Sequence, residues 1–277
     1  MYDDILLPVD ESTESTAVVH HAAEIAHWAD ATVRVLNVAD TGRDSVTVVE
    51  ADVVDTLVRQ GDTVVAEVGS TLDTLGVEYT TDVVQGDPAP TIVEYAERYE
   101  YDLIVMPTHA RQSLSRYLLG SVTEKVVRLS PVPVLTARML EGDDLEFPYE
   151  SILLPTDGSD TALRAAEHGL DLAAALDAQV HVLSVVEDER GPEEAATEAI
   201  DAVVSAADER GVTAIHRHVE HGNPDELIEL VADAHDVDAV VMGTTGRRGV
   251  DRVLMGSVAE KTVRSVSVPV ITVRKES

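Results

Sequence analysis

The sequence contains no cysteine, which excludes disulfide bonds, thiolate metal ligands and cysteine nucleophiles. Basic residues are scarce, since 20 Lys and Arg stand against 52 Asp and Glu, for a formal net charge of −32. Nucleic acid and anionic membrane surfaces would both repel such a chain, so neither is expected as a partner. Long apolar runs are also missing, and the acidic opening Met1–Asp4 does not resemble a secretory signal peptide. We therefore expect a soluble cytoplasmic protein.

The abundant acidic residues do not indicate a disordered chain. Hydrophobic residues make up 44% of the sequence, and the acidic residues are spread over segments of helical period rather than gathered in one block. At about 1 M salt the Debye length is about 3 Å, so the self-repulsion of an acidic surface is largely screened. The composition favours a globular protein from a halophile.

Short apolar runs alternate with segments of helical period through the first half of the chain. The expected strands cover residues 5–10, 32–38, 77–84, 103–106 and 132–136, and the expected helices cover 12–29, 45–75, 88–98 and 121–129. The second helix is expected to be interrupted at Gly61 and Gly69. Alternating strands and helices imply parallel pairing through right-handed crossovers, and hence a doubly wound sheet. In such sheets ligands bind where the strand order reverses, here beyond the ends of strands one and four.

The second half of the chain repeats the first. Residues 151–157 match 4–10 at an offset of 147, whereas Gly222-Asn223-Pro224 matches Gly86-Asp87-Pro88 at an offset of 136, so the second copy is shorter by 11 residues. The acidic stretch 139–148 lies between the copies and is expected to be a linker. We predict an internal duplication. It consists of two tandem α/β domains, residues 1–140 and 148–277, each a five-stranded mostly parallel sheet flanked by helices.

The stretch 240–261 has the features of a phosphate-binding loop. An apolar run ends at Gly243, two residues separate it from Gly246, and after nine more residues Gly256-Ser257 opens a helical segment. Glycines allow positive φ and a close approach of ligand to backbone N–H groups. Ser257 with Glu260 fits a capping box, which would place free N–H groups at residues 256–258. Arginines of the loop add positive charge, namely Arg247, Arg248 and Arg252.

Each of these residues also has a purely structural interpretation. Gly243 could simply end a strand, Gly249 could serve a turn, and Ser257 could cap a helix without any ligand. The joint spacing favours the phosphate-binding interpretation. It is neither the dinucleotide fingerprint nor the Walker A pattern, because the chain lacks Gly-Lys-Ser/Thr here.

This spacing, together with Pro155-Thr156-Asp157 after the first strand of the second copy and Val185 at the end of the next, resembles the universal stress protein family. The resemblance spans almost the whole chain and implies binding of ATP, with or without Mg²⁺. It assigns the adenine and ribose to the residues after strands one and two, and the phosphates to the glycine loop. The implied binding residues are Pro155, Thr156, Asp157, Val185, Met242, Gly243, Gly246, Arg247, Gly256, Ser257 and Val258.

The first copy departs from this pattern. Asp10, Val38, Gly120 and Ser121 match it, but Pro107 stands for Gly243 and Ala110 for Gly246. Proline has no N–H and a fixed φ, so it cannot replace a glycine that donates to phosphate. We expect the first site to be weak or empty, although His109 could touch whatever it retains. Asp157 itself could instead be the N-cap of the helix that follows it, and the two roles are compatible.

Other chemistry has less support in the sequence. His216 and His218 would share one face of a strand, as two metal ligands can, with His221 nearby. The favoured interpretation is that they are solvated strand residues, so no metal site is predicted. No Gly-x-Ser-x-Gly elbow and no placed nucleophile and base are recognisable, so no catalytic residue is assigned.

The prediction is therefore a stress-linked regulatory module that binds an adenine nucleotide. The family commonly pairs such domains through the last strand, so residues 132–136 and 268–273 would meet as an intramolecular pseudodimer, and a homodimer is a further assembly. Two alternatives remain open: a slow Mg²⁺-dependent ATPase with the metal near Asp157, and a nucleotide-free interaction scaffold.

Overall fold

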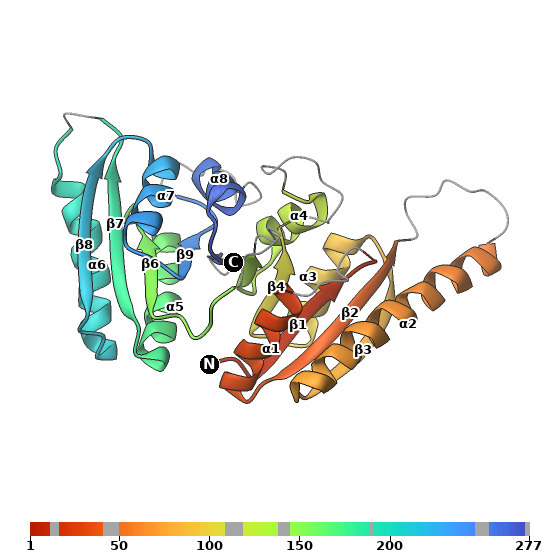
Figure 1. The fold of residues 1–277 in the computed structure, drawn as a ribbon. Helices are drawn as coiled ribbons and strands as arrows, with labels where there is room; N and C mark the ends of the chain where they lie inside the picture. The colour runs from red at the N-terminus through yellow and green to blue at the C-terminus, as the bar shows by residue number, and fades with distance from the viewer. Residues whose placement is uncertain are drawn as a thin grey trace. The chain divides into compact units, whose positions relative to one another are not determined.

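The computed structural model is described over residues 1–11, 17–40, 50–108, 119–137, 145–188, 191–246 and 255–274, and over the side chains of the second helix from residue 57 onward. It consists of two compact units, Met1–Leu145 and Glu146–Ser277. Figure 1 shows strands and helices alternating along both units. No helix in the described ranges combines the length and apolar character that crossing a membrane requires.

The described part of the first unit contains five strands and four helices. The strands are β1 (Asp4–Val9), β2 (Thr32–Asp40), β3 (Tyr79–Gly86), β4 (Leu103–Pro107) and β5 (Val134–Ala137). The helices are α1 (Ala17–Ala29), α2 (Glu50–Leu75), α3 (Pro88–Arg98) and α4 (Ser121–Leu129). The predicted order of elements is confirmed, and the bounds of α3 and α4 match the predicted ranges.

The second unit repeats this order in its described residues. Its strands are β6 (Ser151–Pro155), β7 (Gln179–Val186), β8 (Ile215–His221), β9 (Ala239–Gly243) and β10 (Val270–Val273). Its helices are α5 (Asp160–Leu176), α6 (Glu194–Arg210), α7 (Pro224–Ala234) and α8 (Ser257–Ser265). The shortening of the second copy falls between its second and third strands, because α2 has 26 residues and α6 has 17.

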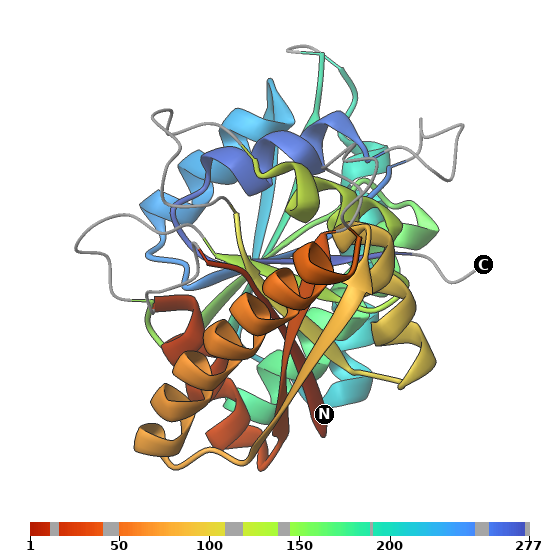
Figure 2. The same ribbon diagram turned by 90° about the vertical axis from the view of Figure 1, so that its right-hand side faces the viewer.

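The glycines expected to interrupt the second helix do not do so, and α2 is continuous from Glu50 to Leu75. A Cβ at Gly61 would stand 2.5 Å from Oδ1 of Asn37, and one at Gly69 would stand 2.6 Å from the ring of Tyr79. These glycines therefore let α2 lie close against β2 and β3 (Figure 2). Tertiary packing outweighs the unfavourable helix propensity of glycine.

Both sheets are doubly wound, as predicted. The strand order is β3-β2-β1-β4-β5 in the first unit and β8-β7-β6-β9-β10 in the second, and the described pairs are parallel. In the first unit α1 packs beside α2 and α3 beside α4, and in the second α5 packs beside α6 and α7 beside α8. The central strands are covered on both faces, so their apolar runs are fully buried, as at Leu153 and Val240.

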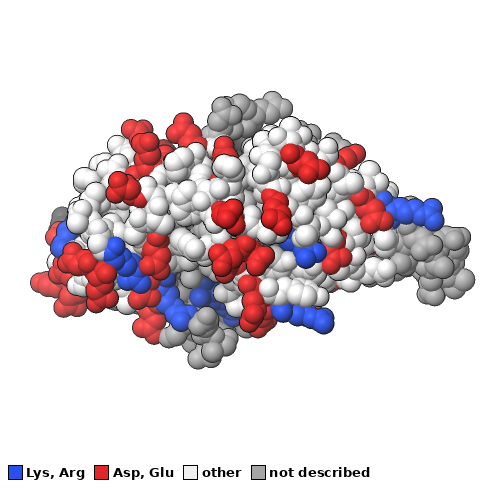
Figure 3. Space-filling model, turned by 90° about the horizontal axis from the view of Figure 1, so that it is seen from below, with Lys and Arg blue, Asp and Glu red and all other residues white. Residues whose placement is uncertain are grey.

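The strand order reverses between β1 and β4 in the first unit and between β6 and β9 in the second. In open α/β sheets, ligands bind at such points, beyond the carboxyl ends of the strands. On the face shown in Figure 3, acidic side chains are scattered rather than gathered into one patch. The reversal point of the second unit is where the residues expected to bind a nucleotide converge.

Candidate functional site

The turn after β6 places a carboxylate at the reversal point. β6 ends at Pro155, and the N–H of Thr156 still donates to the carbonyl of Leu183 in β7 (2.8 Å). Asp157 then leaves the sheet and is exposed. Its Oδ1 accepts from the N–H of Ser159 (3.0 Å), which fixes the side chain over the turn. Asp157 thus presents a positioned carboxylate at the edge of the sheet.

Ser159, and not Asp157, caps the following helix. The Ser159 hydroxyl accepts from the N–H of Ala162 (3.2 Å), and its backbone is extended with φ −74° and ψ 157°. The alternative interpretation of Asp157 as the N-cap of α5 is therefore wrong. The glycine between them takes φ +74°, which moves the N-cap two residues beyond Asp157.

Gly246 lies against this carboxylate. A Cβ added at Gly246 would stand 2.6 Å from Oδ2 of Asp157. One added at Gly243 would meet the backbone of Thr161 in α5, at 3.1 Å from its carbonyl carbon and oxygen. Neither glycine takes a positive φ, so these two positions do not use the conformational freedom that glycine allows. Gly243 is required by the packing of β9 on α5, whereas a side chain at position 246 would displace the carboxylate of Asp157.

Gly256 completes the same cluster from the far end of the loop. Its N–H donates to the carbonyl of Thr244 (2.8 Å). A Cβ there would stand 3.3 Å from that oxygen and 3.9 Å from the amide nitrogen of Gly246. The structure therefore brings Asp157, Gly246 and Gly256 together, although they are far apart in the sequence.

The start of α8 has backbone N–H groups that the helix itself leaves without an acceptor. Gly256 is the N-cap, with φ −66° and ψ 144°, and Ser257 is the first helical residue. The predicted capping box is wrong, because Ser257 lies inside the helix and Glu260 instead pairs with Arg264 (2.7 Å). The first intrahelical bond runs from Glu260 N–H to Gly256 (3.0 Å), so the N–H groups of residues 257–259 have no acceptor within the helix. The helix N-terminus is where it was expected, but the N–H of Gly256 is bonded to Thr244, so the expectation of free N–H groups at residues 256–258 is wrong for Gly256.

The remaining expected residues lie around this cluster. Val185 and Asp157 each follow by two residues the paired positions Leu183 and Pro155, so they end neighbouring strands at the same edge. The Met242 side chain is 5% exposed, so a ligand would meet its backbone rather than its side chain. Arg247, with Arg248, Gly249 and Arg252, lies outside the described residues.

The first unit has the corresponding backbone but a different strand end. The N–H of Gly120 donates to the carbonyl of Thr108 (2.7 Å), as Gly256 does to Thr244. Pro107 ends β4, and its carbonyl accepts from the hydroxyl of Thr123 (2.9 Å). Asp10 is exposed and Val38 half-buried, in positions like those of Asp157 and Val185. His109 and Ala110 lie outside the described residues.

Histidines form a second group that the sequence reveals only in part. His216 and His218 do share a face of β8, but they meet His181 of β7, and His218 also meets His235 after α7. His221 stands apart, at 3.0 Å from Glu193 and 3.1 Å from the carbonyl of Asp188, and the bond to Glu193 raises its pKa. Because the partners come from other elements, spacing within one strand could not reveal the group.

The fold defines a protein of two tandem doubly wound α/β domains. A family model for the universal stress protein family matches residues 1–138 and 148–274. The chain therefore belongs to the universal stress protein family, with two such domains in tandem. This membership confirms the resemblance inferred from the glycine spacing.

Individual relatives agree with this membership. A universal stress protein of Methanocaldococcus jannaschii is 35% identical over 51% of this chain and 90% of its own length. One from Mycolicibacterium smegmatis is 28% identical over 98% of this chain and 96% of its own. The crystal structure of a universal stress protein from Archaeoglobus fulgidus has a TM-score of 0.79 with 24% identity, over 99% of this chain and 97% of that one. The last likeness extends the shared fold to the whole tandem chain.

Proposed function

We propose that this protein is a regulatory module that binds ATP, with or without Mg²⁺, at one principal site in its second unit. The observation that carries the proposal is the approach of Gly246 to the carboxylate of Asp157, beside the start of α8. It brings an acceptor suited to ribose hydroxyls next to backbone donors suited to phosphates. The carboxylate of Asp157 and the start of α8 therefore suit the two ends of a nucleotide.

The described residues fit such a ligand chemically. The N–H groups of Ser257 and Val258 have no intrahelical acceptor and lie at the positive end of the helix dipole, which attracts phosphate. Gly256 brings the backbone close to Gly246 without an intervening side chain. Val185 ends the strand next to Asp157 and would offer its backbone to the adenine base. Arg247 would add positive charge on the phosphate side.

The first unit would bind a nucleotide weakly or not at all. Pro107 has no N–H to donate at the end of β4, and its carbonyl accepts a hydrogen bond from Thr123.

We take the domains as residues 1–140 and 148–277, and propose that they pair as an intramolecular pseudodimer in the cytoplasm of a halophile. Light scattering on the intact chain distinguishes this assembly from a homodimer.

The first experiment is to denature the freshly purified chain, prepared in concentrated potassium chloride, and identify any released nucleotide by chromatography. About one ATP per chain is expected for a single principal site. If none is released, titration of the intact chain with ATP and Mg²⁺ should still saturate at about one per chain. Failure of both measurements would reject ATP binding and leave the scaffold alternative.

Hydrolysis is a separate question for the same preparation. We expect the chain to have no catalytic residue. Steady-state phosphate release by the unsubstituted chain should therefore equal that of the Asp157→Asn variant. Phosphate release that this substitution abolishes would instead establish a slow ATPase.

A further inference from the structure

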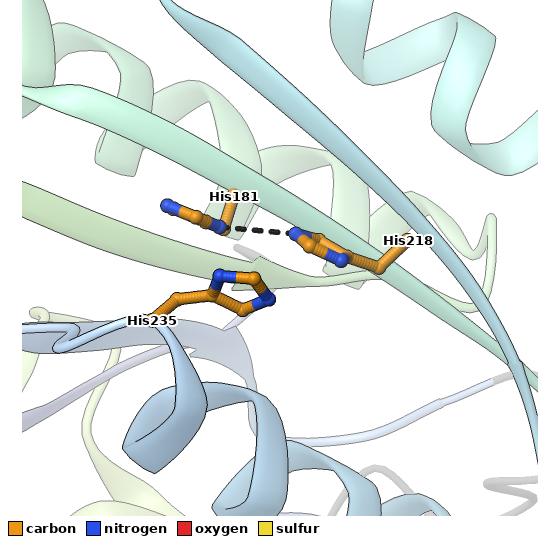
Figure 4. A group of neighbouring side chains, drawn as sticks. All are labelled: His181, His218 and His235. Carbon is orange, nitrogen blue, oxygen red and sulfur yellow. Dashed lines mark hydrogen bonds between the residues drawn. The ribbon is translucent and has the colours of Figure 1, made fainter.

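Three histidines of the second unit each bring one ring nitrogen to within 4.8 Å of the others. His181 is the third residue of β7, His218 lies in β8, and His235 is the C-cap residue of α7. Figure 4 shows the rings of His181 and His218 facing each other, with the ring of His235 approaching from the end of the helix. Two strands and a helix thus converge on one point.

The spacing of these rings is close to that of metal ligands. Nδ1 of His181 lies 3.0 Å from Nε2 of His218. Tetrahedral Zn²⁺ binds histidine nitrogen at about 2.0–2.1 Å, which separates two ligand nitrogens by about 3.3 Å. The His235 ring centroid is 4.8 Å from those of the other two rings. Because His235 is exposed, its side chain can turn inward to close the remaining gap.

Two of the three rings have a lowered pKa, which favours the neutral form that binds metal. Burial, reinforced by three neighbouring imidazoles, lowers the pKa of His181 to about 4. Burial and then His235 also lower the pKa of His218, while Glu220 acts in the opposite direction. These two rings are therefore neutral at pH 7, so an incoming ion releases no proton to solvent. The proton in the hydrogen bond between Nδ1 of His181 and Nε2 of His218 must move to the other nitrogen of its ring before both atoms can bind the ion.

We propose that His181, His218 and His235 bind a divalent transition-metal ion of the borderline class, with Zn²⁺ as its type. Three imidazole nitrogens without a carboxylate suit Zn²⁺, Co²⁺ or Ni²⁺ and not the oxygen-seeking Mg²⁺ or Ca²⁺. His181 is 3% exposed and anchors the site inside the domain, whereas His235 opens it to solvent. A fourth position is left for water or an exogenous ligand, as in open zinc sites.

This site is distinct from the proposed nucleotide site. His181 lies near the beginning of β7 and Val185 near its end, four residues further, a separation of about 13 Å along the strand. His235 follows α7, whose chain then turns into the beginning of β9. The metal site therefore lies toward the opposite end of the strands from the proposed nucleotide site, and its occupancy can be tested without nucleotide.

The test uses the full chain, stripped with a chelator and titrated with Zn²⁺ by calorimetry in excess Mg²⁺, which occupies the many carboxylates. Co²⁺ serves as a second probe, because tetrahedral nitrogen ligation gives it intense visible absorption. We expect one Zn²⁺ per chain. His235→Ala and His218→Gln should each weaken binding by at least about tenfold and remove the Co²⁺ absorption.

His221→Ala is the matched control, since this histidine lies on the same strand outside the group, and it should change the affinity less than about twofold. Circular dichroism checks that each variant is folded, and His235 is chosen because its exposure makes misfolding a minor risk. Absence of stoichiometric Zn²⁺ binding in excess Mg²⁺ overturns the proposal. So does an equal loss of affinity in His221→Ala and His235→Ala.

Discussion

Gly246 and Asp157 lie in contact across the reversal point of the second sheet, where a Cβ on the glycine would stand 2.6 Å from Oδ2 of the carboxylate. Real Cβ atoms do not approach an oxygen so closely, so any side chain at position 246 must push Asp157 or the loop away. The glycine is thus explained by a contact with a residue 89 positions earlier (246 − 157). The proposed binding of ribose and phosphate depends on this contact.

Gly246→Ala is expected to weaken ATP binding by about 5- to 150-fold, since overpacking of a tight contact costs about 1–3 kcal/mol. The measurement is a calorimetric titration of the folded variant. In the double variant with Asp157→Ala the clash is absent, so the alanine at 246 should cause little further loss. An additive loss in the double variant would show that the glycine acts independently of Asp157.

Asp157→Asn is expected to weaken ATP binding by about 10- to 100-fold, because a charged acceptor contributes roughly 1.5–3 kcal/mol to its hydrogen bonds. Asparagine keeps Oδ1, so the bond from the Ser159 N–H and the turn should survive. Asp10→Asn is the matched control in the first copy and should leave the principal affinity unchanged. Equal effects of the two substitutions would argue against a single principal site.

Ser159→Ala is expected to lower the free energy of unfolding of the second unit by about 1 kcal/mol, through loss of the cap on α5. Ser257→Ala should change it by less than about 0.5 kcal/mol, because Ser257 is exposed and makes no capping bond. Denaturant unfolding monitored by circular dichroism measures both. A larger loss at Ser257 than at Ser159 would contradict the helix starts described above.

His21 should make the first unit sensitive to acid. Burial lowers its pKa from 6.5 to about 4, so between these values the unfolded chain binds the proton and the folded chain does not. Its contribution to stability is complete above pH 6.5 and is lost as the pH falls toward 4. The loss is on the order of 3 kcal/mol at most.

The matched variants for this pH dependence are His21→Gln and His27→Gln, on the buried and exposed sides of α1. The free energy of unfolding is measured from pH 7 to 4 in each. His21→Gln should flatten the fall in stability, whereas His27→Gln should follow the unsubstituted chain. Comparing the variants cancels the contribution of the carboxylates to the pH dependence, because they titrate alike in all three chains. Parallel curves for the two variants would refute the assignment to His21.

Much of the fold could be predicted from the sequence because its signals are local. Apolar runs closed by proline, glycine or aspartate marked the strands, and the repeat of residues 4–10 at 151–157 marked the duplication. The alternation of elements then left the doubly wound sheet as the consistent arrangement. Proline at the start of α3 and the helical period of α4 allowed the first and last residues of both helices to be predicted correctly.

The failures came where a distant residue decides. Gly61 and Gly69 indicated breaks in the second helix. The structure shows that glycine is needed there because a side chain at either position would collide with β2 or β3. Ser257 with Glu260 had the spacing of a capping box, but Gly256 is the N-cap, so the helix starts one residue earlier than that box requires. At Gly243 the sequence indicated only that glycine allows a close approach, and the structure shows that the approaching group is the backbone of Thr161 in α5.

The sequence by itself determined the family, the duplication, the order of strands and helices, and the glycine spacing of the second copy, because each is written in residues close together along the chain. Only the tertiary structure decided which groups meet. Gly246 touches Asp157, and His181 joins His218 and His235, because parallel strands and the helices between them bring separate segments to one place. Such contacts depend on which strands are neighbours in the sheet and on the register between them, and no local pattern of residues encodes either.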